Sequence, residues 1–310
     1  RGEAPADRRP GPASLLSDHA ANLRAAGLTT AAVALFALSD TIVKLLTERY
    51  PPGQILFCRG TVAVLVLALV LGLRQRRDAF RLPWRDPATW LRSCCELGVA
   101  LCFFRALGAM PLAEATAVLF VFPILLTALA APVLRERVGW RRWLAVAAGL
   151  VGVLVILRPG TAAFDPSAGW ALAAAGFIAA RDLATRFLRP DARTEAVALM
   201  TTSFTTLASL ATLPFGWVAL EPSGAMGFAA SAVLVSAAFL CLVAGTRTGD
   251  VSFTAPFRYV TVPLTFLLGF LVWGQVPDLF VLVGTVIVVA SGLFVVRRGR
   301  IAMARRPAIR

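Results

Sequence analysis

The sequence is poor in the side chains on which most enzymes and metal proteins depend. It holds one histidine, His19, and one lysine, Lys44, among 310 residues. Its five cysteines all lie inside apolar runs, and none has the spacing to histidine that a metal site requires. These absences argue against a metal centre, a disulfide framework and a catalytic histidine or cysteine cluster. We therefore expect no cofactor.

Acidic charge is also scarce, with 17 Asp and Glu against 31 Lys and Arg and a net charge of +14. A basic balance can indicate nucleic-acid binding. Here, however, the arginines fall mainly in short segments between apolar runs, so membrane topology explains them better and no nucleic-acid partner is expected. The first 20 or so residues have no apolar core, so they do not resemble a secretory signal.

Apolar residues are what the chain has in abundance: 58% of it is hydrophobic and its mean hydropathy is +0.76. A soluble domain of this size could not bury that much apolar surface. A helix needs about 20 mostly apolar residues to cross a bilayer. The sequence thus predicts an all-α membrane protein, in contact with the lipid bilayer, whose ten transmembrane helices lie near residues 25–46, 54–73, 89–108, 113–134, 138–157, 167–187, 194–214, 225–245, 250–273 and 277–296.

The two halves of the sequence resemble each other at a nearly constant offset. Pairs 140 residues apart are Ala115 and Ala255, Pro123 and Pro263, and Gly152 and Gly292; pairs 142 residues apart are Asp40 and Asp182, and Lys44 and Arg186. Five spans per half is an odd number, so the second half starts on the opposite side of the membrane. We expect two inverted five-helix repeats, an arrangement typical of secondary transporters, with the substrate between them. The first repeat covers residues 25–160 and the second 161–297, between a tail of residues 1–24 and a basic tail of residues 298–310.

The distribution of basic residues between the spans predicts the orientation of the chain. With ten spans, both termini lie on the same side of the membrane. Of the 31 Lys and Arg residues, 24 lie on that side, two (Arg49 and Arg158) lie on the other, and five lie within spans. The sequence therefore predicts a multi-pass protein of the bacterial inner membrane with both termini in the cytoplasm.

Charged residues inside the predicted spans are the first candidates for a functional site, since each costs about 2.5–3.5 kcal/mol to insert. They are Asp40, Lys44, Arg59, Glu96, Arg105, Arg181, Asp182 and Arg258. We expect Asp40 and Asp182, which occupy matching places in the two halves, to line one central cavity and bind substrate. The alternative is that each carboxylate pairs with the cation one turn further along its own helix, Lys44 or Arg186.

Three further residues complete the predicted substrate site. Glu96 would accept a substrate cation or a proton, unless it pairs with Arg92 one turn earlier. Pro256 interrupts an apolar span and is expected to kink it. Just after it, Arg258 and Tyr259 could bind a substrate carboxylate and stack on a flat or cationic group, or else serve as an interhelical salt bridge and a packing ring.

Phe120 is the last predicted contact. It lies in the fourth span shortly before Pro123, and its alternative role is packing. The glycines at 149, 152, 284 and 292 are expected to let helices approach closely. The predicted substrate-binding residues are thus Asp40, Glu96, Phe120, Asp182, Arg258 and Tyr259, with no catalytic or metal-binding residue among them.

The sequence resembles the EamA-type drug/metabolite transporter superfamily over about residues 25–297. The likeness rests on the ten spans, the repeat, Pro-Leu-Ala-Glu-Ala-Thr-Ala before Pro123, and Arg135-Glu136-Arg137 followed by Trp140. Ser39-Asp40 with Lys44, Asp165-Pro166, Asp182, and Ala255-Pro256-Phe257-Arg258-Tyr259 are similar to the bacterial S-adenosylmethionine uptake branch. Gln275 stands where a glutamate matching Glu136 is common.

The resemblance implies a secondary transporter of a small organic metabolite that works by alternating access, with S-adenosylmethionine uptake as one possibility. It also implies exchange with a counter-substrate or coupling to a proton. The alternative within transport is an exporter of amino acids or drugs. A membrane-embedded enzyme would need a nucleophile, an acid/base cluster or a metal site, and the spans contain no histidine and no Cys/His cluster. A structural adaptor would leave the intramembrane charges with no cavity to serve.

Overall fold

A computed structural model gives the fold of residues 12–73, 82–133, 140–159, 165–189, 191–248 and 254–304. The first eleven residues and the Arg135-Glu136-Arg137 motif lie outside this description. Within the described residues the secondary structure is helical throughout. The first half holds α1 (Pro12–Thr47), α2 (Pro52–Leu73), α3 (Pro87–Ala109), α4 (Leu112–Leu119), α5 (Phe122–Val133) and α6 (Trp140–Leu157). The second half holds α7 (Ala168–Thr185), α8 (Thr194–Ser209), η2 (Leu210–Thr212), α9 (Pro222–Thr248), η3 (Ala255–Val260), α11 (Thr261–Trp273) and α12 (Leu279–Ala304).

Each of the ten predicted spans coincides with one helix or with one interrupted helix. Among the described residues, four segments are long and apolar enough to cross a membrane: Ala21–Thr47, Pro52–Leu73, Leu112–Val133 and Pro222–Gly245. Three shorter apolar helices cover Trp143–Leu157, Phe257–Trp273 and Leu279–Phe294. Helices α3 and α7 are not in this set, because charged side chains reduce their hydropathy: Arg92, Glu96 and Arg105 in α3, and Arg181 and Asp182 in α7.

Two of the spans are interrupted near matching places. Between α4 and α5 the backbone turns at Phe120 and Val121, just before Pro123. Proline has no amide hydrogen to donate to the carbonyl of Leu119, and the amide of Ile124 donates to Val121 rather than to Phe120. The α4–α5 span therefore exposes two backbone carbonyls in its middle.

The second interruption falls where Pro256 predicted a kink. Residues Ala255–Val260 form the 3-10 segment η3, with the proline in its first turn, and the α-helix resumes at Thr261. This break precedes Pro263 just as the first break precedes Pro123. Both interruptions thus have the same local cause, a proline whose ring excludes continuous α-helical hydrogen bonding.

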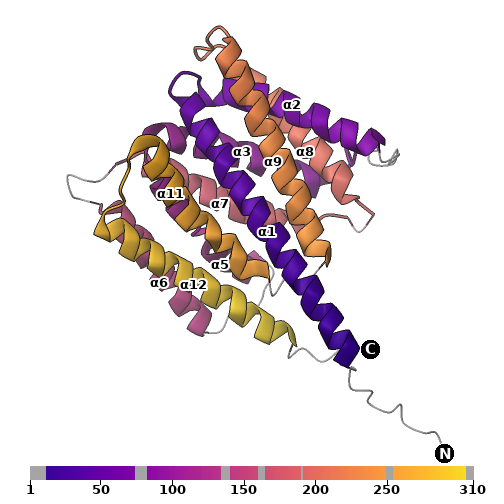
Figure 1. The fold of residues 1–310 in the computed structure, drawn as a ribbon, viewed down its shortest axis with the longest axis vertical. Coiled ribbons are helices and arrows are strands. Elements are labelled where there is room, and N and C mark those ends of the chain that lie inside the picture. Colours follow the sequence, from indigo (N-terminus) through magenta and orange to yellow (C-terminus); the bar gives the residue numbers. More distant parts are fainter. Residues whose placement is uncertain are drawn as a thin grey trace, which may run out of the picture.

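The main helix pairings all join the first half of the chain to the second. Helix α1 packs along α9, and α3 packs along α7. In the same way α2 packs against α8 and α6 against α12. The interrupted spans do so too, since α4 and α5 contact α7 while η3 and α11 contact α1. Figure 1 shows α1 running between α9 and α11, with its start and the end of α12 at the same end of the bundle.

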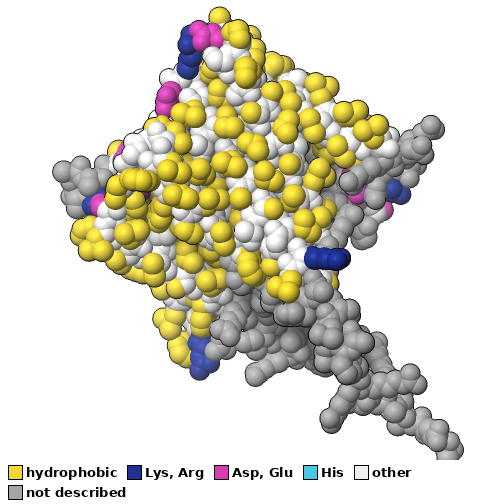
Figure 2. Space-filling view, in the orientation of Figure 1, with side chains coloured by type: hydrophobic (Ala, Val, Ile, Leu, Met, Phe, Trp, Pro, Cys, Tyr) yellow, Lys and Arg dark blue, Asp and Glu magenta, His cyan; other side chains and the backbone are white. Residues whose placement is uncertain are grey.

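The outer surface is apolar, as a lipid-facing surface should be. On the face formed by α1, α9, α11 and α12, Figure 2 shows hydrophobic side chains over nearly the whole area and charged side chains at its periphery. Leu271 and Val286, for example, are 66% and 67% exposed. Solvated protein surfaces do not carry an apolar area of this extent, so this face is suited to lipid.

Glycines at the α6–α12 contact allow close packing of the two helices, as predicted. A Cβ at Gly152 would lie 2.9 Å from the carbonyl oxygen of Gly284, and one at Gly284 would lie 2.6 Å from the carbonyl oxygen of Gly152. A Cβ at Gly149 would collide with Ile124, and one at Gly292 with the hydroxyl of Tyr259. The predicted packing role is therefore confirmed at all four positions.

Candidate functional site

Six charged residues of alternating sign link the helices that meet at the centre of the bundle. In order they are Asp40 (α1), Arg59 (α2), Glu96 (α3), Arg181 and Asp182 (α7), and Arg258 (η3). The charges of Asp40 and Glu96 both act on Arg59, and those of Arg181 and Asp182 act on Arg258. In the predicted topology, four of the six lie in the cytoplasmic half of their spans, and Asp40 and Arg59 lie in the opposite half. The row thus joins both halves of the chain at membrane depth.

Direct ion pairs form at the centre of this row, around Arg181. Its Nη1 donates to Oε2 of Glu96 at 2.9 Å. Its Nε and Nη2 donate to Oδ1 of Asp182 at 2.9 and 2.8 Å. All three side chains are about one-quarter to one-third exposed. One guanidinium thus holds two carboxylates, one from each half of the chain, while leaving the second oxygen of each carboxylate uncommitted.

The local pairing that the sequence suggested for Glu96 and Asp182 is therefore not what the structure contains. Glu96 bonds to Arg181 across the α3–α7 contact, and Arg92 instead donates to the hydroxyl of Thr185 at 2.9 Å. Asp182 bonds to its neighbour Arg181 rather than to the cation four residues on. Glu96 is held across the α3–α7 contact, whereas Asp182 is held within α7 by the same guanidinium.

Asp40 also lacks the predicted local partner. Lys44 is 8% exposed, and its Nζ donates to the carbonyls of Leu107 and Met110 at 2.7 Å each. The same ammonium lies 5.4 Å from the ring centre of Trp273. Lys44 thereby satisfies carbonyls at the end of α3, where a helix dipole favours a cation, and it leaves Asp40 to other partners.

The environment of Asp40 is polar but lacks a direct donor. Within the described residues, its carboxylate accepts no hydrogen bond and makes no ion pair. The nearest opposing charge is Arg59, whose Nη2 donates to the hydroxyl of Ser39 at 3.1 Å and whose guanidinium lies over the Phe104 ring. The Ser39 hydroxyl donates in turn to the carbonyl of Ser231 on α9 at 3.0 Å. Asp40 is thus a half-buried carboxylate with unused acceptor capacity.

The two interrupted spans meet through aromatic rings. The centroids of Phe120 and Tyr259 are 5.2 Å apart and their planes are tilted by 41°. Tyr259 is 9% exposed, and its buried hydroxyl, next to Gly292, has no hydrogen-bond partner among the described residues. Phe120 remains half-buried. Both predicted aromatic contacts thus lie together at the breaks, with Tyr259 as a packed ring rather than an open stacking platform.

Arg258 differs from the other arginines of the row because its guanidinium has no bonding partner among the described residues. Its side chain is exposed, and it makes neither an ion pair nor a hydrogen bond with the part of the chain that the structure describes. The predicted alternative of a salt bridge to a neighbouring helix is therefore not found there. The arrangement can offer a free guanidinium to an anionic group and the free oxygens of three carboxylates to a cationic one.

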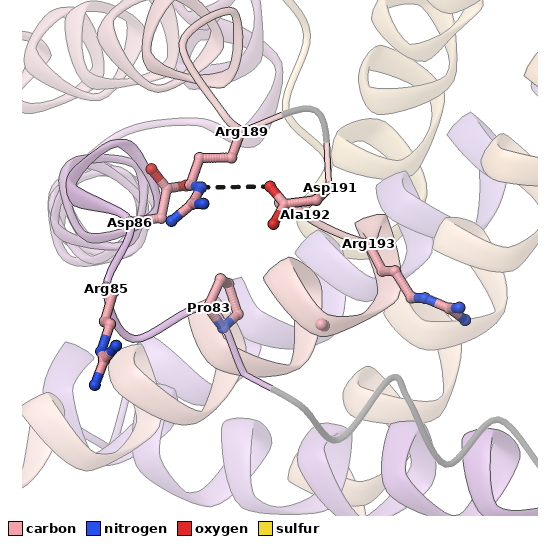
Figure 3. Close-up of a pocket in the computed structure, with 8 residues that line it drawn as sticks. Pro83, Arg85, Asp86, Arg189, Asp191, Ala192 and Arg193 are labelled. Carbon is pink, nitrogen blue, oxygen red and sulfur yellow. Dashed lines mark ion pairs between the residues drawn. The ribbon is translucent and has the colours of Figure 1, made fainter.

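A separate pocket of about 360 Å³ opens between the α2–α3 and α7–α8 connections. It is lined by Pro83, Arg85, Asp86, Arg189, Asp191, Ala192, Arg193 and Ala196. Arg189 pairs with Asp191 at 3.3 Å, whereas Arg85 and Arg193 extend away in different directions (Figure 3). Asp86 is occupied in capping α3. None of the predicted substrate residues lines this pocket.

Sequence reasoning named Arg59 and Arg181 only as intramembrane charges and did not place them in the site. It named Ser39 only as part of the family resemblance and did not name Ser231. The signal for the two arginines was present, since a buried cation needs an acidic partner and the nearby carboxylates were already candidates. The serines gave no such signal, because a lone serine in an apolar helix most often bonds to its own backbone.

Comparison with known proteins finds a family match in the first half of the chain. Residues 23–158 match the model of the EamA-like transporter family. Over these residues the chain is similar to the EamA-like transporters. The matched stretch coincides with the first predicted repeat and contains Asp40, Arg59 and Glu96. Because the family and the relatives below are named as transporters, the prediction of a transporter rather than an enzyme is confirmed.

The curated relatives of this chain are named for different substrates. A riboflavin transporter of Vibrio cholerae is 26% identical over 84% of this chain and 88% of its own length. An S-adenosylmethionine uptake transporter of Rickettsia felis is 28% identical over 63% of this chain and 67% of its own length. The pseudopaline exporter CntI of Pseudomonas aeruginosa is 23% identical over 87% of this chain and 95% of its own length. Similarity at this level therefore does not select one substrate for this chain.

A solved crystal structure is similar to this chain over nearly its whole length. The TM-score is 0.61 at 21% sequence identity, and the match covers 91% of this chain and 99% of the other. At that identity the likeness concerns the fold alone. It agrees with a single membrane bundle in which both halves of the chain take part.

Proposed function

We propose that this chain is an inner-membrane secondary transporter that moves a small organic metabolite by alternating access. The substrate would carry a carboxylate and a cationic group, and S-adenosylmethionine is the first candidate. It would bind between the two halves, in contact with Asp40, Glu96, Asp182 and Arg258, and near the aromatic pair of Phe120 and Tyr259.

The observation that carries this proposal is the pair of unpartnered charges at the two ends of the central row. Asp40 and Arg258 lie within spans, where charge is costly, and neither is neutralised by a direct contact within the described residues. A ligand with both signs of charge would compensate both residues. The freed backbone carbonyls beside Phe120 would add acceptors at the same depth.

An inverted repeat would supply the two access states. The helix pairings support it. In an inverted repeat the first span, α1, corresponds to the sixth, α7, and the third, α3, corresponds to the eighth, α9, so the α1–α9 contact should have a counterpart between α7 and α3, and these two helices do pack together. The α4–α7 contact likewise becomes the contact of η3 and α11 with α1. The breaks before Pro123 and Pro263 support it too, since they fall 140 residues apart. Rocking of one half against the other around the row of charges would then expose it to each side.

Both termini would lie in the cytoplasm. The 24-to-2 distribution of basic residues supports this orientation, and so does the position of the start of α1 and the end of α12 at one end of the bundle (Figure 1). Alkaline-phosphatase fusions after Arg310 should then be inactive. An active fusion at that position would exclude this topology.

An exporter of amino acids or drugs is the second candidate. The pseudopaline exporter among the relatives favours it, because the same fold evidently serves transport in that direction. The direction depends on the coupling, for which a proton or a counter-substrate is the candidate. Uptake by inside-out and right-side-out vesicles, each with and without a proton gradient, separates the two directions.

Uptake into proteoliposomes tests the proposal directly. Purified protein should accumulate labelled S-adenosylmethionine in exchange for internal unlabelled compound, and labelled riboflavin and an amino-acid mixture serve as competing substrates. Replacement of Asp40 by Asn or of Arg258 by Gln should reduce this exchange while the protein remains in the membrane. Wild-type exchange in both variants would exclude these residues from the site.

A further inference from the structure

The ion pairs around Arg181 carry a consequence for substrate choice. One guanidinium bonds to two carboxylates, so Glu96, Arg181 and Asp182 together carry one net negative charge. Arg92 and Arg258 lie close enough to act electrostatically on this group. With Asp40 and its nearest opposing charge, Arg59, added, the seven charged side chains sum to +1. This balance depends on Arg181, because without it the same region would be neutral.

We infer that Arg181 is a specificity-determining residue: by holding Glu96 and Asp182, it biases the central site toward substrates that carry a carboxylate beside their cationic groups. This inference rests on the proposed function. A substrate carboxylate would bind the free Arg258 guanidinium, while its cation would meet the uncommitted oxygens of Glu96 and Asp182. A substrate with cationic groups alone would leave Arg258 uncompensated and would be repelled by it.

The geometry explains why this residue is an arginine. Three N–H groups of Arg181, on Nε, Nη1 and Nη2, donate to carboxylates from two different helices at 2.8–2.9 Å. A lysine has the same charge but a single nitrogen, so it cannot reproduce this fork. The charge and the geometry of Arg181 can therefore be tested separately, with Arg181→Gln and Arg181→Lys.

Three further arginines, from α2, α3 and η3, act electrostatically on this cluster. Arg92 from α3 donates to Thr185, Arg59 from α2 interacts with the charge of Glu96, and Arg258 reaches it from η3. All three are arginines and stay charged at any physiological pH. A change in the sign of the site therefore comes from substitution, not from titration of these neighbours.

S-adenosylmethionine and its decarboxylated form are suitable probes, because they share the adenosyl sulfonium skeleton and differ by the carboxylate. The wild-type protein should transport S-adenosylmethionine with the higher kcat/KM. Arg181→Gln should shift the ratio of the two kcat/KM values toward the decarboxylated probe by about tenfold, the effect of one charge at roughly 10 Å in a medium of intermediate dielectric. Arg181→Lys should lower transport of both probes and leave the ratio near the wild-type value.

The outcomes separate the two claims. If the wild-type protein transports neither probe, the proposed function fails and the inference fails with it. If it transports S-adenosylmethionine but Arg181→Gln lowers the kcat/KM of both probes by the same factor, the proposed function stands and Arg181 has only a structural role. If Arg181→Gln does not yield a monodisperse protein, Glu96→Gln replaces it, and the ratio should move in the opposite direction. An unchanged ratio in Glu96→Gln would overturn the inference.

Discussion

The contact between α6 and α12 gives the sharpest stability prediction, because backbone meets backbone there. Replacing Gly152 by Ala would place a methyl group 2.9 Å from the carbonyl oxygen of Gly284 and from a methyl of Val288. A side chain could rotate away, but a helix backbone cannot. The two helices would have to separate by several tenths of an ångström along their contact.

The expected cost follows from this geometry. Overpacking a tight interior contact costs about 1–3 kcal/mol, and the better helix propensity of alanine offsets at most about 1 kcal/mol of it. Gly152→Ala should therefore be destabilised. Gly176→Ala in α7 is the matched control, because a Cβ there has no neighbour within 4 Å. It should be neutral or slightly more stable.

Thermal unfolding of the purified proteins in one detergent measures this difference. Gly152→Ala should melt below the wild-type protein and Gly176→Ala at or above it. Equal melting temperatures for the two variants would refute the reasoning, since the contact would then be loose enough to admit a methyl group. Gly284→Ala, which meets the same backbone from the other side, should repeat the Gly152→Ala result.

Three further predictions concern single side chains. Lys44→Met should lower the melting temperature, by the equivalent of about 1.5–3 kcal/mol, because two buried carbonyls lose a charged donor; a variant as stable as wild type would mean that water replaces the ammonium. Tyr259→Phe should retain both stability and transport, since the hydroxyl has no partner to lose, whereas Tyr259→Ala should lose about 3–5 kcal/mol of stability through the cavity it leaves; a large effect of Tyr259→Phe on KM alone would instead assign the hydroxyl to substrate. Asp278→Ala should lose about 1 kcal/mol near neutral pH, because this side chain accepts from an amide in the first turn of α12. That hydrogen bond, together with the nearby Arg158 guanidinium, lowers the pKa of Asp278 below its usual 3.8. The ionised carboxylate therefore stabilises the fold fully above pH 3.8, and this stabilisation is lost as the pH falls through the lowered pKa. In denaturant titrations at pH 7, Asp278→Ala should have a lower free energy of unfolding than the wild-type protein. Below pH 3.8 this difference should shrink and disappear.

The helices and the interruption at Pro256 could be predicted from the sequence because their causes are local. Apolar runs of about 20 residues determine the spans, and a proline within a span interrupts its helix. The turn at Phe120 and Val121 was not predicted, although Pro123 follows it in the sequence. Gly152 and Gly284 could be assigned to packing for the same reason.

The partners of the charges could not be predicted in the same way. Spacing along one helix suggested pairs between Asp40 and Lys44 and between Glu96 and Arg92. In the structure Lys44 reaches carbonyls of α3, and Glu96 bonds to Arg181 of α7. Which charges meet depends on how neighbouring helices are aligned along their length, and that alignment is set by side-chain packing between segments far apart in sequence. Within-helix spacing carries no information about it.

Counterflow in proteoliposomes tests the central claim most directly, since it detects carrier-mediated exchange without assuming a driving ion. Vesicles preloaded with unlabelled S-adenosylmethionine should take up the labelled compound transiently above its equilibrium level. With Arg258→Gln the overshoot should be lost, although the protein reconstitutes at the same level. Absence of an overshoot with the wild-type protein, or an equal overshoot with Arg258→Gln, would contradict a carrier that binds this substrate at the row of charges between its two halves.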